Sequence, residues 1–172
     1  MHRLVHIGIL LSLITSASLA PLGSQTIDSL AFKDLQFRMV GPFRGGRSSA
    51  VTGFPADLDR WLMGTTGGGV WETTDNGISW RNISDGFFGG SIGAVRVADS
   101  DPNVIYVGQG SADIRGNTST GRGMWKSMDA GRTWAFIGLP EAGQIGRIEV
   151  HPGDHNLVYV AALGHPFGKN PE

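Results

Sequence analysis

The sequence contains no cysteine among its 172 residues, which excludes a disulfide framework and attachment of a lipid to a cysteine. It also lacks an excess of either charge, because the formal net charge is −1. This near-neutral balance removes the electrostatic argument for nucleic acid or an anionic membrane as a partner. The fold must therefore be held together by packing alone.

The sequence also lacks a hydrophobic run long enough for a secure membrane span. The first 20 residues, MHRLVHIGILLSLITSASLA, combine a short basic start, an apolar run and a small-residue end. This pattern is typical of a secretory signal peptide, and it is too short and weakly flanked for a secure membrane span. Cleavage is expected after Ala20 or, because Pro21 disfavours that site, after Ala17. The alternatives are an uncleaved anchor or a misassigned start. We expect a secreted or periplasmic protein.

Glycine is abundant, with 27 residues and no collagen period, which indicates many tight turns. Three stretches align: SSAVTGFPADLDRWLMGTTG from Ser48, IGAVRVADSDPNVIYVGQGS from Ile92, and IGRIEVHPGDHNLVYVAALG from Ile145. Each reads as an alternating strand, a turn and a second apolar strand. The second copy differs from the first by an insertion, QGSADIRGNTSTGR, after its second strand.

The two complete copies continue with a third strand, a shared turn motif and a fourth strand. Four short strands at a period of about 40 to 55 residues predict propeller blades, although a sandwich remains an alternative. We predict an all-β, partial β-propeller over residues 35–172, with blade 1 at about 47–84, blade 2 at about 91–138 and the start of blade 3 at about 144–172.

The shared motif is TTDNGISW in the first copy and SMDAGRTW in the second. The glycine permits a positive φ in a hairpin, and the aspartate can accept hydrogen bonds from backbone amides of its own turn. The tryptophan begins the next strand and can bury its ring between adjacent sheets. The motif residues are Thr73, Asp75, Gly77 and Trp80 in the first copy and Ser127, Asp129, Gly131 and Trp134 in the second. A calcium loop would need more oxygen ligands and a distant Glu, so we interpret the motif as structural.

These motifs resemble the Asp-box, or bacterial neuraminidase repeat, of sialidases, xyloglucanases and the sortilin ectodomain. The segment FRMVGPFRGGR at Phe37–Arg47 most resembles secreted bacterial sortilin-like proteins that are often labelled glycosyl hydrolases. The resemblance implies the fold and leaves the activity open, because one fold hosts many functions.

In such blades the loops after strand 2 and the links between blades share one face, where propellers usually bind ligands. Arginines gathered there would suit a carboxylate or sugar-acid ligand, or they could pack against carbonyls and form local ion pairs. The candidate ligand-binding residues are Arg44, Arg47, Asp113, Arg115, Arg122 and His165.

Catalytic residues are not predicted in this chain. A sialidase needs a tyrosine nucleophile, whereas the only two tyrosines, Tyr106 and Tyr159, align inside the second strand as expected core positions. The xyloglucanase-like turn GTTGGGVW places Thr66 where the resemblance implies a catalytic Asp. The HPGDH stretch at 151–155 occupies an ordinary turn, so we predict neither a metal site nor a cofactor.

We therefore expect a sortilin-like, non-catalytic binding or scaffold module for a protein or peptide ligand. The alternative is part of a xyloglucanase- or sialidase-like glycoside hydrolase whose catalytic carboxylates lie partly outside this chain, and a third possibility is an assembly factor. About three blades fall short of a closed ring, which takes typically four to eight. The expected partners are thus the remaining blades of a longer chain, or further copies of this chain that close the ring.

Overall fold

The computed structural model describes residues 28, 32–35 and 46–170. The chain divides into two units, Met1–Val40 and Gly41–Glu172. In the first unit the described residues include a short turn, in which the Leu35 amide donates to the Phe32 carbonyl at 3.0 Å. The expected signal peptide and Arg44 lie outside the described residues. Within the described part, no helix has the length and apolar character needed to cross a membrane.

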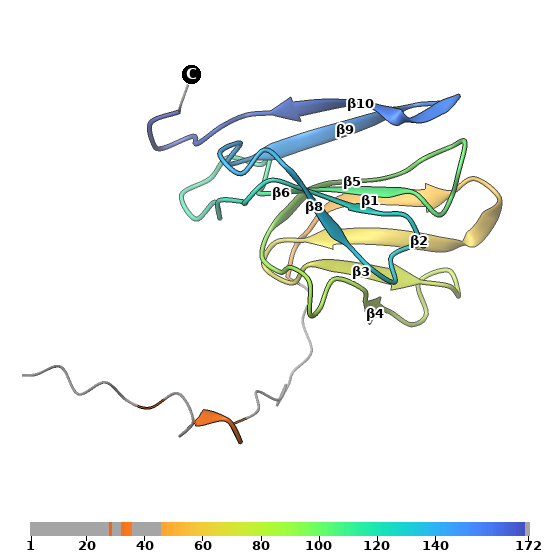
Figure 1. Ribbon diagram of the computed structural model, residues 1–172, viewed down its shortest axis with the longest axis horizontal. Helices are drawn as coiled ribbons and strands as arrows, with labels where there is room; N and C mark the ends of the chain where they lie inside the picture. The colour runs from red at the N-terminus through yellow and green to blue at the C-terminus, as the bar shows by residue number, and fades with distance from the viewer. Residues whose placement is uncertain (1–27, 29–31, 36–45, 171–172) are drawn as a thin grey trace, which may run out of the picture. The chain divides into compact units, whose positions relative to one another are not determined.

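The described part of the second unit is built from three antiparallel sheets in chain order (Figure 1). The first sheet contains β1 (Ser48–Phe54), β2 (Asp57–Thr65), β3 (Val70–Thr73) and β4 (Arg81–Asn82). The second contains β5 (Ile92–Val97), β6 (Ile105–Gln109), β7 (Met124–Ser127) and β8 (Ala135–Gly138), and the third contains β9 (Ile145–His151) and β10 (Asp154–Ala162). The prediction of a partial propeller, with two four-stranded blades and the start of a third, is confirmed.

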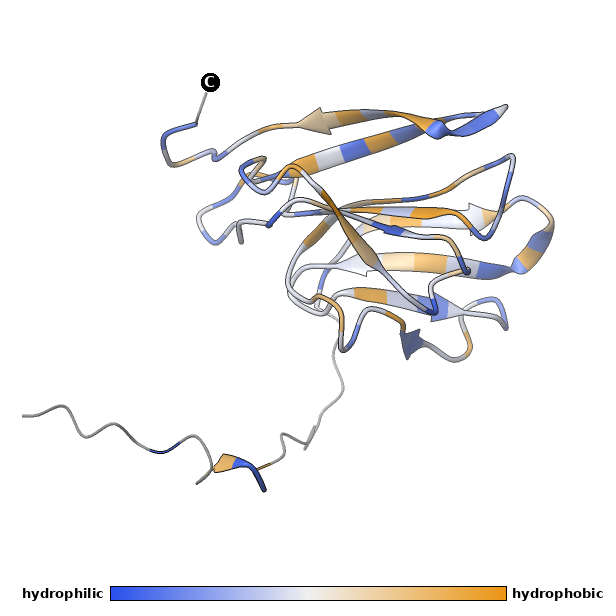
Figure 2. Ribbon diagram, viewed as in Figure 1, coloured by the Kyte–Doolittle hydropathy of each residue, from blue (hydrophilic) through white to orange (hydrophobic). Residues whose placement is uncertain are grey.

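The sheets pack face to face, with their first strands side by side. Strands β1, β5 and β9 together line a shallow groove, the position that the innermost strands of a propeller take around its axis. Figure 2 shows hydrophobic and polar residues interspersed along β9, as expected for a strand whose two faces meet different surroundings.

Two hydrophobic clusters fill the spaces between the sheets. Phe54, Leu62 and Val70 of the first sheet pack with Val107 and Trp134 of the second. Between the second and third sheets the cluster consists of Ala94, Ala98, Val104, Tyr106, Met124, Ile145, Ile148 and Val150. The second sheet is therefore covered on both faces, and its strand β6 is buried along its whole length.

Two sequence expectations are wrong at the outer sheets. Tyr106 is 3% exposed, but its counterpart Tyr159 is 66% exposed, although both were expected in the core. Likewise Trp134 is 7% exposed, whereas Trp80, expected between adjacent sheets, is 36% exposed. The physical reason is the same in both cases: the residues that would cover these side chains belong to a neighbouring sheet, and the described residues provide none there.

Candidate functional site

One backbone hydrogen bond recurs in all three sheets, at the end where the second strand of each sheet finishes. The amide of the residue after β2 donates to the carbonyl before β1, Thr66 to Arg47, at 2.8 Å. The corresponding bonds join Gly110 to Ser91 at 2.8 Å and Leu163 to Gln144 at 2.7 Å. Because these bonds fix the segments before each first strand, Arg47, Ser91 and Gln144 hold equivalent positions at this end.

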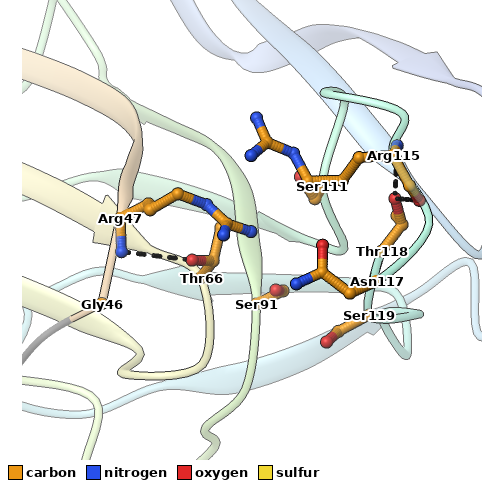
Figure 3. Close-up of a pocket in the computed structure, with 9 residues that line it drawn as sticks. All are labelled: Gly46, Arg47, Thr66, Ser91, Ser111, Arg115, Asn117, Thr118 and Ser119. Carbon is orange, nitrogen blue, oxygen red and sulfur yellow. Dashed lines mark hydrogen bonds between the residues drawn. The ribbon is translucent and has the colours of Figure 1, made fainter.

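A cavity of about 370 Å³ opens at this end between the first sheet and the insertion that follows β6. Figure 3 shows the guanidinium groups of Arg47 and Arg115 extending into it from opposite sides. The remaining lining residues are small or neutral: Gly46, Thr66, Ser91, Ser111, Asn117, Thr118 and Ser119. The lining thus combines two cations with hydroxyl and amide groups and has no acidic side chain.

Threonine hydroxyl groups hold the backbone at both arginines. On one side, the Arg47 amide donates to the Thr66 hydroxyl oxygen at 3.2 Å. Gly46 has a φ of +86°, and a Cβ there would come within 2.6 Å of the Thr66 carbonyl oxygen, so glycine permits this close approach. On the other side, the Thr118 hydroxyl donates to the Arg115 carbonyl at 2.8 Å and accepts from the Arg115 amide at 3.0 Å.

The two guanidinium groups have no acidic partner among the residues that the structure describes. The ion pairs of the described residues involve Arg60, Arg81, Arg96 and Arg147 instead. A guanidinium carries five N–H donors in a planar fork that matches a carboxylate or phosphate. Two such groups facing one space, with no carboxylate to neutralise them, favour an anionic ligand.

A second cavity of about 430 Å³ adjoins the first, since Ser91 lines both. Its wall includes Phe87, Phe88, Trp125 and Arg122. Phe88 and Trp125 stack with ring centroids 4.8 Å apart, and the Trp125 indole donates to the Gln109 side-chain oxygen at 3.2 Å. The aromatic wall was not foreseen from the sequence, because its rings come from a link between blades and from a third strand.

The six predicted ligand-binding residues are thus only partly brought together. Arg47 and Arg115 line the first cavity, and Arg122 lines the second. Asp113 belongs to the same insertion as Arg115 but lines neither cavity, and His165 lies in the segment that follows β10. Arg44 lies outside the described residues.

The turn motifs lie at the opposite end of the sheets from this site. The Asn76 amide in the first motif donates to the Asp59 carbonyl near the start of β2, at 2.9 Å, and the Ala130 amide donates to the Asn103 carbonyl at the same distance. Strand β2 runs from that end towards Thr66, which lines the cavity. The motif residues therefore contribute nothing to the cavity lining.

Each motif aspartate closes its own turn. Asp75 accepts from the Ser79 hydroxyl at 2.6 Å and the Ser79 amide at 2.8 Å, and Asp129 accepts the same two bonds from Thr133. The side-chain bond from Ser79, followed by that residue's amide, lowers the pKa of Asp75 from 3.8 to about 2. Thr133 has the same effect on the pKa of Asp129. Both carboxyl groups are therefore ionised acceptors across the physiological pH range.

In the part of the chain that the structure describes, no three His, Asp or Glu side chains lie close enough together to hold a metal ion. The histidines of the HPGDH stretch lie on either side of the turn between β9 and β10, with His151 at the end of β9 and His155 near the start of β10. The His151 ring nitrogen accepts from the Gly153 amide in that turn at 3.2 Å.

Comparison with known proteins shows the fold and leaves the family open. No family model and no curated protein matches the chain. Among solved structures, an ancestral GH74 enzyme superimposes with a TM-score of 0.54 and 20% identity, over 66% of this chain and 16% of that one. A GH74 xyloglucanase from Xanthomonas campestris gives 0.50 and 23%, over 73% of this chain and 21% of that one. The chain thus spans about a fifth or less of these β-propeller glycoside hydrolases.

Proposed function

We propose that this chain is a non-catalytic, sortilin-like binding module that acts outside the cytoplasm and holds an anionic group of a protein or peptide ligand. The observation that carries the proposal is the cavity into which Arg47 and Arg115 both extend without an acidic partner among the described residues. A peptide carboxylate is the simplest group that offers two oxygens to two guanidinium forks.

The chemistry of the lining supports binding over hydrolysis. Glycoside hydrolysis ordinarily uses two carboxyl groups on either side of the scissile bond, and none of the residues that line the cavity is acidic. Thr66, at the position where the resemblance to xyloglucanases implies an Asp, instead accepts a hydrogen bond from the Arg47 amide. A hydroxyl at this position can orient a ligand but cannot act as a glycosidase acid or base near neutral pH.

The test uses N-acetylglycine as the smallest probe with a peptide-like carboxylate, and N-acetylglycinamide as its neutral match. We expect the acid to perturb the amide NMR signals of Ser91, Ser111 and Asn117, and the amide probe to leave them unchanged. Arg47→Gln and Arg115→Gln should each weaken binding by about tenfold, as loss of a charge-assisted hydrogen bond does. Arg132→Gln, in the distant turn motif, is the matched control. Equal binding of both probes would contradict the proposal.

The second candidate function is part of a carbohydrate-active glycoside hydrolase, and the fold shared with the GH74 enzymes favours it. In that case the catalytic carboxylates would lie partly outside this chain. The test therefore uses a complete propeller ring that contains this chain, incubated with xyloglucan and with a sialoside, and measures released reducing sugar and free sialic acid. Release by the wild-type ring that Arg47→Gln and Arg115→Gln both abolish would support the hydrolase, whereas no release by the complete ring supports the binding module.

A further inference from the structure

The first sheet exposes a face whose counterpart on the second sheet is buried. Val95, Val107 and Trp134 of the second sheet pack against the first sheet. The equivalent positions in the first sheet are Val51, Met63 and Trp80, and Val51 is 67% exposed. The register places Val51 beside Met63, and Met63 beside Trp71, in one row across three strands. We call this row, together with Trp61 and Trp80, the head face.

The tryptophan of the turn motif shows what covers such a face. The Trp134 indole donates to the Ile83 carbonyl of the first sheet at 2.9 Å, so it spans the interface between the two sheets. The Trp80 indole donates only within its own turn, to the Gly77 carbonyl at 3.1 Å. Trp80 therefore occupies the position of an intersheet tryptophan without a neighbouring sheet on that side among the described residues.

The third sheet exposes the opposite kind of face. The Tyr106 hydroxyl of the second sheet donates to the His155 carbonyl of the third at 2.8 Å. Tyr159 is its counterpart, and its hydroxyl has no hydrogen-bond partner in the described part of the chain. Tyr159, Ala161 and the Arg147–Glu149 ion pair line a recess of about 260 Å³. We call these four residues the tail face.

We propose that two copies of this chain associate head to tail, the head face of one packing on the tail face of the other. Both halves of the interface are present on one chain, and the same kind of interface already occurs twice within it, between consecutive sheets. No like charges face each other across this contact, since the head face is uncharged and the arginine and glutamate of the tail face pair with each other. Contiguous apolar surface such as the head face marks an interaction site.

A head-to-tail contact is heterologous, so each copy keeps one free face and association continues into rings or filaments. This property makes the proposal testable by complementation. Val51→Glu blocks the head and leaves the tail intact, while Tyr159→Glu blocks the tail and leaves the head intact. Both side chains are largely exposed, so neither substitution opens a cavity in the core. Circular dichroism of each variant checks that it folds.

The experiment is sedimentation velocity over a hundredfold range of protein concentration. We expect the wild type to form dimers and larger species as concentration rises, and each variant alone to remain monomeric. An equimolar mixture of the two variants should form dimers and nothing larger, because only one productive head and tail remain. Tyr159→Phe should weaken association by about fivefold through loss of one hydrogen bond. Ile114→Glu, exposed in the insertion, is the control and should behave as wild type.

Three results would overturn the proposal: a wild type that stays monomeric throughout, assembly that survives both glutamate substitutions, or assembly that is lost in Val51→Glu alone. The last result would indicate a head-to-head dimer. None of these outcomes depends on the anion-binding test, which uses other residues.

Discussion

At the scale of single residues, Asp129 shows how one side chain organises a turn. Its carboxylate accepts from the Thr133 hydroxyl, the Thr133 amide and the Ser127 hydroxyl, while the Ser127 hydroxyl oxygen accepts from the Gly131 amide at 2.8 Å. These bonds favour the ionised form and lower the pKa of Asp129 to about 2. A carboxyl whose pKa is depressed on folding stabilises the fold above its unfolded pKa and loses that contribution as the pH falls.

Asp129→Asn should therefore lower the melting temperature at neutral pH by roughly 5 °C, because the amide cannot accept all of these bonds. As the pH falls from about 4 to about 2, the wild type should lose stability more steeply than the variant. Thermal unfolding followed by circular dichroism at several pH values measures both effects. Parallel pH profiles for wild type and variant would show that the carboxylate does not contribute in this way.

Backbone strain distinguishes the two motifs. The residue before the motif glycine has a positive φ in both turns, 56° at Asn76 and 59° at Ala130. Asparagine tolerates this region better than alanine does. Ala130→Asn should therefore raise the free energy of unfolding by about 0.5 kcal/mol, measured by urea denaturation. Asn76→Ala, the reverse change in the other turn, should lower it by a similar amount, and a change of the same sign in both variants would contradict this account.

For single residues, the sequence indicates which positions of the repeat are equivalent but not which of them are buried. The alignment of Tyr106 with Tyr159 and of Trp80 with Trp134 was sound as a repeat, yet one member of each pair is buried and the other exposed. A repeat pattern states which face of a sheet a residue occupies, whereas burial depends on whether another sheet covers that face. The structure was also needed to show that Arg47 and Arg115 extend into the same cavity, because the conformation of the insertion determines where the Arg115 side chain lies.

At the scale of elements, a buried carboxylate joins three strands of the first sheet, and one of its arginine partners also contacts the neighbouring blade. Glu72 of β3 is fully buried and pairs with Arg60 of β2, whose terminal nitrogen lies 2.6 Å away, and with Arg81 of β4. Arg60 also donates to the Ala130 carbonyl, in the turn between β7 and β8, at 3.3 Å and lies over the Phe54 ring. The network was not foreseen, because its members meet only when the register of β2, β3 and β4 is known.

Glu72→Gln should lower the free energy of unfolding by about 2 kcal/mol, since it leaves Arg60 partly buried without its counterion. Glu149→Gln is the matched control, because Glu149 pairs with Arg147 on the surface and such pairs contribute about 0–1 kcal/mol. Urea denaturation of both variants, at a concentration where each is monomeric, gives the comparison. Equal losses in the two variants would mean that the buried network contributes no more than a surface pair.

At the scale of the whole molecule, the three sheets of the described residues form a row in which the extensive contacts join consecutive sheets. The second sheet is packed on both faces, the first and third on one face each, and the third has only two strands in the described part. In such arrays, stability is approximately the sum of each unit and its nearest-neighbour contacts. Four-strand periodicity was enough to predict this architecture, but the sequence could not show how unequally the three sheets are covered.

This inequality predicts a gradient of local stability. Amide hydrogens of β5 and β6 should exchange only through global unfolding, whereas those of β9 and β10 should exchange through a smaller opening that releases the third sheet alone. Hydrogen–deuterium exchange followed by mass spectrometry measures this, with the Val51→Glu variant used so that association between copies does not protect the tail face. Peptides covering β9 and β10 should become deuterated well before those covering β6. If all three strands exchanged at one rate, the sheets would unfold as a single cooperative unit, and the row of separable neighbours would be the wrong description of this chain.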